Sequence, residues 1–222
     1  MEFLIFGAGQ MAQAVGFDLV RQPDVERVYV VDNQLRQLRR LQRFLNSSKI
    51  RPVHIPATAP ELKELLARCQ AAISCIPYNY NLRLTRMAIA AGTNFCDLGG
   101  NNTVVRRQLA LDRKARTAGC TVIPDCGLAP GMTNILVADA VSRLDRTETV
   151  RIRVGGLPVK PQPPLFYKLV FSAQGLLNEY AEVQVEAIEG HGGHVLKFMG
   201  DGILAIFPDD DPARACARAL DA

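Results

Sequence analysis

Gly7, Gly9 and Asp32 are the residues near the start of the chain whose types and spacing point most directly to chemistry. Gly7 allows a tight turn and Gly9 lets a backbone approach a pyrophosphate, while Asp32 follows at about the 20-residue spacing of an acid that binds a ribose hydroxyl. Because a carboxylate repels a 2′-phosphate, Asp32 favours NAD over NADP as the cofactor. We predict that the residues contacting it here are Gly7, Ala8, Gly9, Gln10, Met11 and Asp32.

The elements around these residues have the order that such a site requires. The apolar run Phe3–Phe6 reads as a strand, and the spacing after Gly9 predicts a helix whose start offers free N–H groups to phosphates. Ala12 stands where a third glycine often sits and is small enough for the helix to pack on a sheet. A second apolar run, Val28–Val31, ends at Asp32, which completes a strand–helix–strand unit.

Strands and helices continue to alternate, which predicts an α/β fold with a doubly wound parallel sheet. Unusual residues follow three further strands, in the loops at Cys75–Tyr78, Cys96–Gly100 and Pro124–Met132. Strand ends of this kind meet at one edge of a parallel sheet, where ligands bind. A plainer reading is also open: Tyr78 as a half-buried ring beside Pro77, and Asp97 and Asp125 as turn or helix-cap carboxylates.

Composition limits the classes of protein to which the chain can belong. It has 222 residues with a mild net charge of +4, and we predict no nucleic-acid partner. No apolar run reaches the ~20 residues of a membrane span, and the first residues read as a strand and not as a signal peptide. The six cysteines have no CxxC spacing, so neither a metal site nor a disulfide framework is expected. A cytoplasmic protein without a membrane partner fits these features.

Four motifs give the chain a resemblance to a known family. They are Ile76-Pro77-Tyr78, Phe95 to Asn102, Pro124 to Met132 and Val154 to Pro158. Over residues 1 to about 181 the chain resembles the saccharopine dehydrogenase family, and specifically its lysine 6-dehydrogenase branch. In saccharopine reductases the corresponding proline–glycine loop carries an acid where this chain has Ala129. That difference, with Asp32, favours the lysine branch.

The resemblance implies an NAD-dependent oxidation of an amino-acid amine, most specifically deamination of L-lysine at its ε-amine to the 6-semialdehyde. Tyr78, Asp97 and Asp125 are then candidate catalytic residues that orient the substrate or handle protons. Cofactor contacts are expected also from the loops that flank the nicotinamide ribose, at Cys75, Ile76, Pro77, Leu98, Leu128, Ala129 and Pro130. A homo-oligomer is compatible with the family, although no interface can be read from the residues.

The resemblance ends at about Tyr180, before the substrate domain of such enzymes would be complete. Residues 184–222 instead resemble the central β-hairpin and following helix of a class III adenylate/guanylate cyclase, in which Asp201 would stand at a metal-binding position. The companion metal-binding strand of that family is missing, so a complete cyclase is not expected and Asp201 reads best as an ordinary hairpin residue. The chain has the appearance of a junction of two unrelated genes.

These patterns predict a three-part division: an NAD-binding domain at 1–135, a truncated start of a substrate domain at 136–182 and the cyclase-like piece at 183–222. Alternating apolar residues predict a strand at 149–155. If residues 183–188 pair with the hairpin residues 195–207, they could form a small antiparallel unit. Three functions follow as hypotheses. They are amine oxidation (by a lysine 6-dehydrogenase or a saccharopine dehydrogenase), cofactor binding without turnover, and, least favoured, nucleotide cyclisation.

Overall fold

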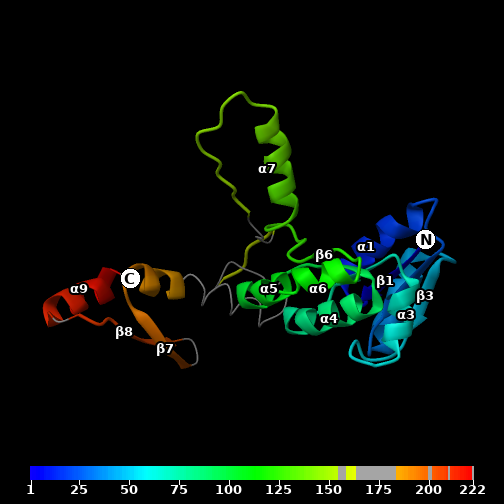
Figure 1. The fold of residues 1–222 in the computed structure, drawn as a ribbon, viewed down its shortest axis with the longest axis horizontal. Helices are drawn as coiled ribbons and strands as arrows, with labels where there is room; N and C mark the ends of the chain where they lie inside the picture. Colours follow the sequence, from blue (N-terminus) through cyan, green and yellow to red (C-terminus); the bar gives the residue numbers. More distant parts are fainter. Residues whose placement is uncertain (155–158, 164–183, 200–201, 210, 222) are drawn as a thin grey trace. The chain divides into compact units, whose positions relative to one another are not determined.

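The computed structural model describes residues 1–154, 159–163, 184–199, 202–209 and 211–221 (Figure 1). The chain forms two units, Met1–Val154 and Gly155–Ala222. Within the described ranges, no helix is both long enough and apolar enough to cross a membrane.

The first unit is built on a sheet of six parallel strands in the order β3-β2-β1-β4-β5-β6. The order runs outward from β1 in both directions, so the predicted doubly wound sheet is confirmed. Pro52 is tolerated in β3 because that strand lies at the edge, where one side needs no hydrogen-bond partner. The strands are β1 (Glu2–Phe6), β2 (Arg27–Val31), β3 (Ile50–Val53), β4 (Ala71–Ser74), β5 (Asn94–Asp97) and β6 (Val122–Ile123).

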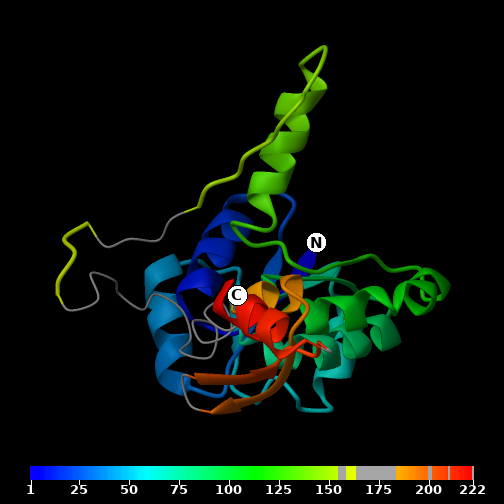
Figure 2. The ribbon, with the colours of Figure 1, turned by 90° about the vertical axis from the view of Figure 1, so that its left-hand side faces the viewer.

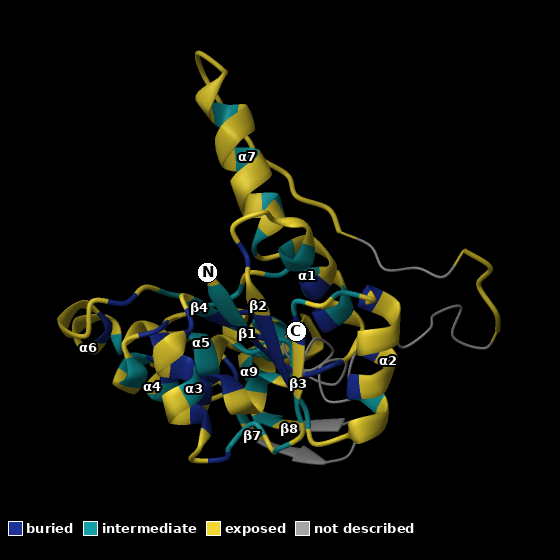
Figure 3. Cartoon of the chain, turned by 90° about the vertical axis from the view of Figure 1, so that its right-hand side faces the viewer, coloured by how far each residue is buried: buried dark blue, intermediate teal, exposed yellow. Residues whose placement is uncertain are grey.

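Helices cover both faces of this sheet, because successive strand residues point to opposite sides. Leu4 and Phe6 pack with residues of α3 and α4 on one face, and Ile5 packs with residues of α1 and α2 on the other. Buried residues accordingly line the sheet-facing sides of these helices in Figure 3, with exposed residues outside. The helices, with one 3₁₀ turn, are α1 (Gln10–Arg21), α2 (Leu35–Leu45), α3 (Leu62–Arg68), η1 (Tyr78–Tyr80), α4 (Asn81–Ala91), α5 (Asn102–Leu109), α6 (Asp112–Thr117) and α7 (Met132–Ser142).

The single helix that the sequence suggests between Thr103 and Ala118 is in fact two helices. The Leu111 N–H bonds to the Gln108 carbonyl, a three-residue step that tightens and ends α5. Asp112 then opens α6, where a negative side chain suits the positive end of the helix dipole. Hydrophobic spacing does not encode such a break, since the apolar residues continue through it.

The strand predicted at 149–155 is wrong over the residues described. Residues 149–154 are irregular, and Val150, Ile152 and Val154 are 45–50% exposed. Alternating apolar residues suit a strand with one buried face, but such a strand also needs a neighbour to pair with. No strand of the six-stranded sheet pairs with residues 149–154.

Helix α7 projects away from the sheet in Figures 1 and 2 and has no buried residue. Its apolar side chains Met132, Ile135 and Leu136 are between 51% and 72% exposed. A helix that is apolar on all sides is normally covered on all sides. Within the described part of the chain, α7 lacks that cover.

The second unit contains a helix over residues 184–190, the antiparallel strands β7 (His194–Met199) and β8 (Gly202–Ile206), and α9 (Pro212–Asp221). The predicted hairpin and its following helix are therefore present. The possible pairing of residues 183–188 with this hairpin does not occur over the described residues of that segment, because they are helical. Gly192, with φ +80°, closes this helix while the Gly193 N–H bonds to the Ile188 carbonyl, a common glycine ending. Asp201 and the segment 164–183 lie outside the described residues.

Candidate functional site

Gly7 forms the turn directly after β1, where the outward strand order reverses between β1 and β4. Its φ of +97° is a conformation that side chains disfavour, and an added Cβ would lie 2.7 Å from Cγ2 of Ile76 and 3.1 Å from the Cys75 carbonyl oxygen. The loops after β1 and β4 therefore touch at this point, and only glycine fits between them. The structure places the predicted residues Gly7, Cys75 and Ile76 side by side.

Gly9 stands at the start of α1 and leaves the space in front of the helix open. No side chain caps the helix, and no acidic residue lies in its first turn. A Cβ built on Gly9 would meet no atom within 4 Å. The first amides of a helix lack intrahelical acceptors and carry the positive end of its dipole. The start of α1, with Gln10 and Met11 exposed, therefore fits a pyrophosphate.

Asp32 follows β2 and is anchored beside the glycine turn. Its carboxylate accepts hydrogen bonds from the Ala8 N–H at 2.8 Å and from the Gln34 N–H at 2.7 Å. One bond goes to each oxygen, so each keeps a further lone pair for a ribose hydroxyl. The arrangement fixes a negative charge next to the turn that begins α1.

Tyr78 begins the 3₁₀ turn after β4 and is half-buried. A Cβ on Gly100, in the loop after β5, would contact the Tyr78 ring at 3.4 Å. The loops after β4 and β5 are thus in contact through this ring. Cys75 lies beside them as an unreactive thiol, because burial raises its pKa to about 12, with a smaller contribution from Cys96.

Asp97 ends β5 and is completely buried. Its carboxylate accepts the Gly99 N–H at 2.8 Å, the Gln108 amide at 2.6 Å and, more weakly, the Asp125 N–H at 3.4 Å. Its backbone carbonyl accepts the Cys126 N–H at 2.7 Å. Asp97 therefore holds together the loops after β5 and β6, which is the role that the plainer reading of this carboxylate describes.

Asp125 follows β6, and its carboxylate packs against Gly99 and accepts the Gly100 N–H. Burial and, secondarily, the charge of Asp97 raise the pKa of Asp125 above its ordinary value, and the Gly100 hydrogen bond partly offsets this. Its φ of +59° is a conformation that Asp and Asn tolerate better than most residues. Of the three candidate catalytic residues, Asp125 combines partial exposure with a perturbed carboxyl.

The remaining predicted cofactor residues lie in or beside the loop after β6. The Leu98 carbonyl faces Gly127, where an added Cβ would approach it to 3.1 Å, while Leu128, Ala129 and Pro130 are exposed. Pro77 is exposed between Ile76 and Tyr78. The loops after β4, β5 and β6 form one contiguous group, and the specific roles predicted for their residues stay predictions.

Sequence reasoning missed a set of polar side chains buried beneath these loops. They are Ser74, Asn81, Thr85 and Gln108, each no more than 2% exposed, and they lead to Asp97. A signal was present in the sequence. Asn81 and Thr85 are four residues apart on the face of α4 that also carries the buried Leu84 and Ala88. Polar residues on an otherwise apolar helix face need buried partners.

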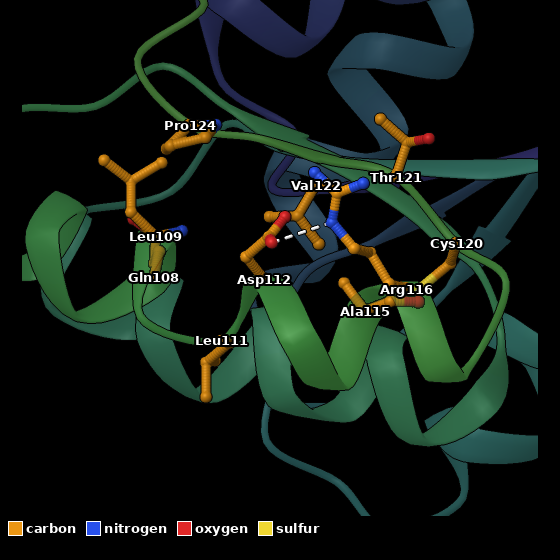
Figure 4. Close-up of a pocket in the computed structure, with 10 residues that line it drawn as sticks. All are labelled: Gln108, Leu109, Leu111, Asp112, Ala115, Arg116, Cys120, Thr121, Val122 and Pro124. Atoms are coloured by element: carbon orange, nitrogen blue, oxygen red, sulfur yellow. Dashed lines mark hydrogen bonds and ion pairs between the residues drawn. The ribbon is translucent and has the colours of Figure 1, made fainter.

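A pocket of about 230 Å³ lies beside the edge strand β6, between it and helices α5 and α6 (Figure 4). Leu109, Leu111 and Val122 contribute its apolar lining, and an ion pair between Asp112 and Arg116 at 2.8 Å crosses it. None of the predicted site residues lines it. The pocket meets the loops at the carboxyl ends of the strands only at Pro124, and the buried Gln108 also lines it.

The strand order, the turn at Gly7 and the uncapped start of α1 together define a dinucleotide-binding domain. Comparison with known proteins makes the class more specific. Residues 3–123 match the family described as the saccharopine dehydrogenase NADP binding domain, and this match covers more than half of the chain. The chain belongs to this family, as its motifs suggested. The match does not extend to residues 184–222, for which the resemblance to a cyclase stays a prediction.

Two curated relatives agree with this assignment. The chain is 25% identical to the mitochondrial alpha-aminoadipic semialdehyde synthase of Bos taurus over 84% of its length, which spans 20% of that protein. It is 26% identical to the NADP(+)-dependent, L-glutamate-forming saccharopine dehydrogenase of Saccharomyces cerevisiae over 78% of its length, spanning 39% of that protein. The chain thus spans well under half the length of either relative.

A solved structure shows the same fold. The apo saccharopine dehydrogenase (L-Glu forming) of Saccharomyces cerevisiae aligns with 96% of this chain at a TM-score of 0.60 and 20% sequence identity. The alignment covers 50% of that structure. These similarities support the family as a whole, and they do not distinguish its branches or its choice between NAD and NADP.

Proposed function

We propose that the chain binds NAD at the glycine turn and serves an oxidoreductase that acts on the amine of an amino acid. The observation that carries this proposal is the start of α1, which is open and uncapped at Gly9 and has the Asp32 carboxylate anchored beside it. Gly7 to Met11 would hold the pyrophosphate, and Asp32 would accept the adenosine ribose hydroxyls. A 2′-phosphate at this carboxylate would face a like charge, which supports NAD over NADP.

The loops after β4, β5 and β6 would hold the substrate amine against the nicotinamide. When bound, NAD would supply an acceptor for the hydride from the carbon that bears the amine, and the nitrogen would lose a proton, which would leave an imine. Water then hydrolyses the imine to an aldehyde and ammonia. Asp125 is the proposed proton acceptor, because it is partly exposed and burial, with the charge of Asp97, raises its pKa above the ordinary value.

L-Lysine, oxidised at its ε-amine to the 6-semialdehyde, is the specific substrate that we propose. Two features of this chain support it over saccharopine: Ala129 stands where the resemblance places an acid in saccharopine reductases, and Asp32 favours NAD. The relatives above carry names that refer to saccharopine and NADP(+). Saccharopine is therefore the competing substrate against which lysine must be measured.

Cofactor binding without turnover is the second candidate, and the exposed apolar helix α7 favours it. Met132, Ile135 and Leu136 follow the loop after β6 and lie open within the described part of the chain. A dehydrogenase site must be closed against water before it transfers a hydride efficiently. If no further wall covers these loops, the chain would bind NAD and leave lysine unchanged.

The two candidates separate in one set of assays on the full chain. NADH formation at 340 nm is followed with L-lysine, saccharopine and other amino acids, each with NAD or NADP, and NAD binding is measured separately by calorimetry. Turnover of lysine that is lost in Asp125→Asn, with NAD binding intact, supports the oxidoreductase. Binding without turnover of any substrate supports the second candidate, and absence of both contradicts the proposal.

A further inference from the structure

The buried polar side chains beneath the loops form one continuous run of hydrogen bonds. Ser74 at the end of β4 donates to Asn81 Oδ1 at 2.8 Å, and the Thr85 hydroxyl donates to the Asn81 carbonyl at 2.8 Å. The Gln108 amide nitrogen donates to the Thr85 hydroxyl at 2.8 Å and to Asp97 Oδ2 at 2.6 Å. The run begins at the end of β4, passes through the first turns of α4 and then through α5, and ends at the end of β5.

Asp97 is the end of this run that faces the candidate site. A fully buried carboxylate is stable only when hydrogen-bond donors surround it. Asp97 takes backbone donors from Gly99 and Asp125, which belong to two different loops, and a side-chain donor from Gln108. Gln108 thus supplies the short hydrogen bond that holds the carboxylate from the α5 side, while the carboxylate's other oxygen holds the loops.

The amide of Gln108 is difficult to explain by packing alone. Its Oε1 is buried and has no hydrogen-bond partner among the residues that the structure describes, and an unsatisfied buried acceptor destabilises the fold. A methionine would fill a similar volume without that penalty. The two hydrogen bonds that its nitrogen donates, to Thr85 and to Asp97, are therefore what a glutamine provides at this position.

We propose that Gln108 is a positioning residue for the proposed reaction: through Asp97 it fixes the loops at 97–100 and 125–131, on which Asp125 and the nicotinamide-side contacts depend. In this assignment Asp97 itself takes no part in proton transfer, because its oxygens are occupied and it has no exposed surface. The proposal rests on the proposed function for its effect on turnover, but the positions of the two loops can be tested without turnover.

Two substitutions distinguish positioning from chemistry. Gln108→Met leaves the Asp97 carboxylate without its side-chain donor, so both loops should loosen. Asp97→Asn removes the charge and keeps an oxygen that can accept the Gly99 N–H, while its amide can donate to the Oε1 of a reoriented Gln108. Asp97→Asn should therefore keep the loops in place and keep most of the turnover. A proton-transferring Asp97 would lose both charge and activity.

The experiment is amide hydrogen exchange by mass spectrometry on the full chain, together with kcat and KM for lysine. Wild type, Gln108→Met, Asp97→Asn and the matched surface control Gln42→Met are compared. In Gln108→Met we expect exchange to rise roughly tenfold in segments covering 97–100 and 124–131, with the β1–α1 segment unchanged. Where the wild type turns over with lysine, kcat should fall roughly tenfold to a hundredfold, a larger change than that of the KM for lysine.

Unchanged exchange in both loops of Gln108→Met, or loss of turnover in Asp97→Asn with its loops in place, would overturn the proposal. If Gln108→Met does not fold, the double variant with Asp97→Asn is measured instead, since removing the buried charge should restore folding. Failure of that rescue also contradicts the proposal. If the wild type binds NAD but oxidises no substrate, the proposed activity alone is contradicted. The hydrogen-exchange data then still test whether Gln108 positions the two loops.

Discussion

Two glycines of the same turn should respond differently to the same added methyl group: cofactor binding should suffer at Gly9 and the stability of the fold at Gly7. At Gly9, φ is −75° and ψ is −166°, and an added Cβ meets only open space. Gly9→Ala should therefore lower stability by less than about 1 kcal/mol, the modest loss expected at a helix cap. The methyl group would stand where the pyrophosphate approaches the helix. Losing even one charge-assisted hydrogen bond there should weaken NADH binding by about tenfold to a hundredfold.

At Gly7 the same substitution acts on the fold. The φ of +97° is strained for alanine, and the new Cβ would lie 2.7 Å from Ile76 and 3.1 Å from the Cys75 carbonyl. Strain and overlap together should remove about 2–4 kcal/mol of stability. For a chain of this size, each kcal/mol lowers the melting temperature by about 2–4 °C. Gly7→Ala should then melt roughly 5–15 °C below wild type.

Thermal melting and NADH titration of each variant provide the assay, and Gly119→Ala is the control. Gly119 has a φ of +66° with no atom within 4 Å of an added Cβ, so it reports backbone strain alone, away from the predicted cofactor residues. It should melt somewhat lower and bind NADH normally. Two results would refute these roles: NADH binding by Gly9→Ala as tight as by wild type, or a melting temperature of Gly7→Ala no lower than that of Gly9→Ala.

Three further outcomes follow from the site. Asp32→Asn keeps an acceptor for the Ala8 N–H and removes the charge, so titrations should show the preference for NADH over NADPH fall by roughly tenfold; an unchanged ratio contradicts this role. The raised pKa of Asp125 means that its carboxyl favours the folded state below its unfolded pKa of about 3.8, and that this contribution is lost as pH rises through the folded pKa. The melting temperature of Asp125→Asn should therefore rise relative to that of wild type as pH rises above about 4. A difference in melting temperature that does not change with pH would contradict the raised pKa of Asp125. With a pKa of about 12, Cys75 should be alkylated by iodoacetamide at pH 8 far more slowly than the exposed Cys216, as peptide mapping would show; equal rates would mean that the thiol is not buried.

The sheet and the turn at Gly7 and Gly9 could be predicted from the sequence, because the residue pattern of each segment favours the same structure that the whole fold requires there. The apolar runs that become β1 and β2 are buried on both faces, and the two glycines allow a turn that other residues would strain. The end of α4 at Gly92, with φ +68°, follows the same logic. In such segments the nearest residues in the chain decide the structure.

The segments that were predicted wrongly depend on partners elsewhere. Residues 149–154 carry the alternation of a strand, but no strand among the described residues pairs with them. Residues 184–190 alternate too, yet a helix ended by Gly192 forms there. The role of Asp97 was hidden for a similar reason: its donor Gln108 is eleven residues away on another element, and only the fold brings them together.

The measurement that tests the central claim most directly is a calorimetric titration of the full chain with NADH, run in parallel on wild type and Gly9→Ala. We expect a saturable, one-to-one isotherm for wild type and weaker binding for the variant, although both proteins should melt at nearly the same temperature. No binding of NADH or NADPH to the folded wild type, or identical isotherms for the two proteins, would contradict a dinucleotide site at the start of α1.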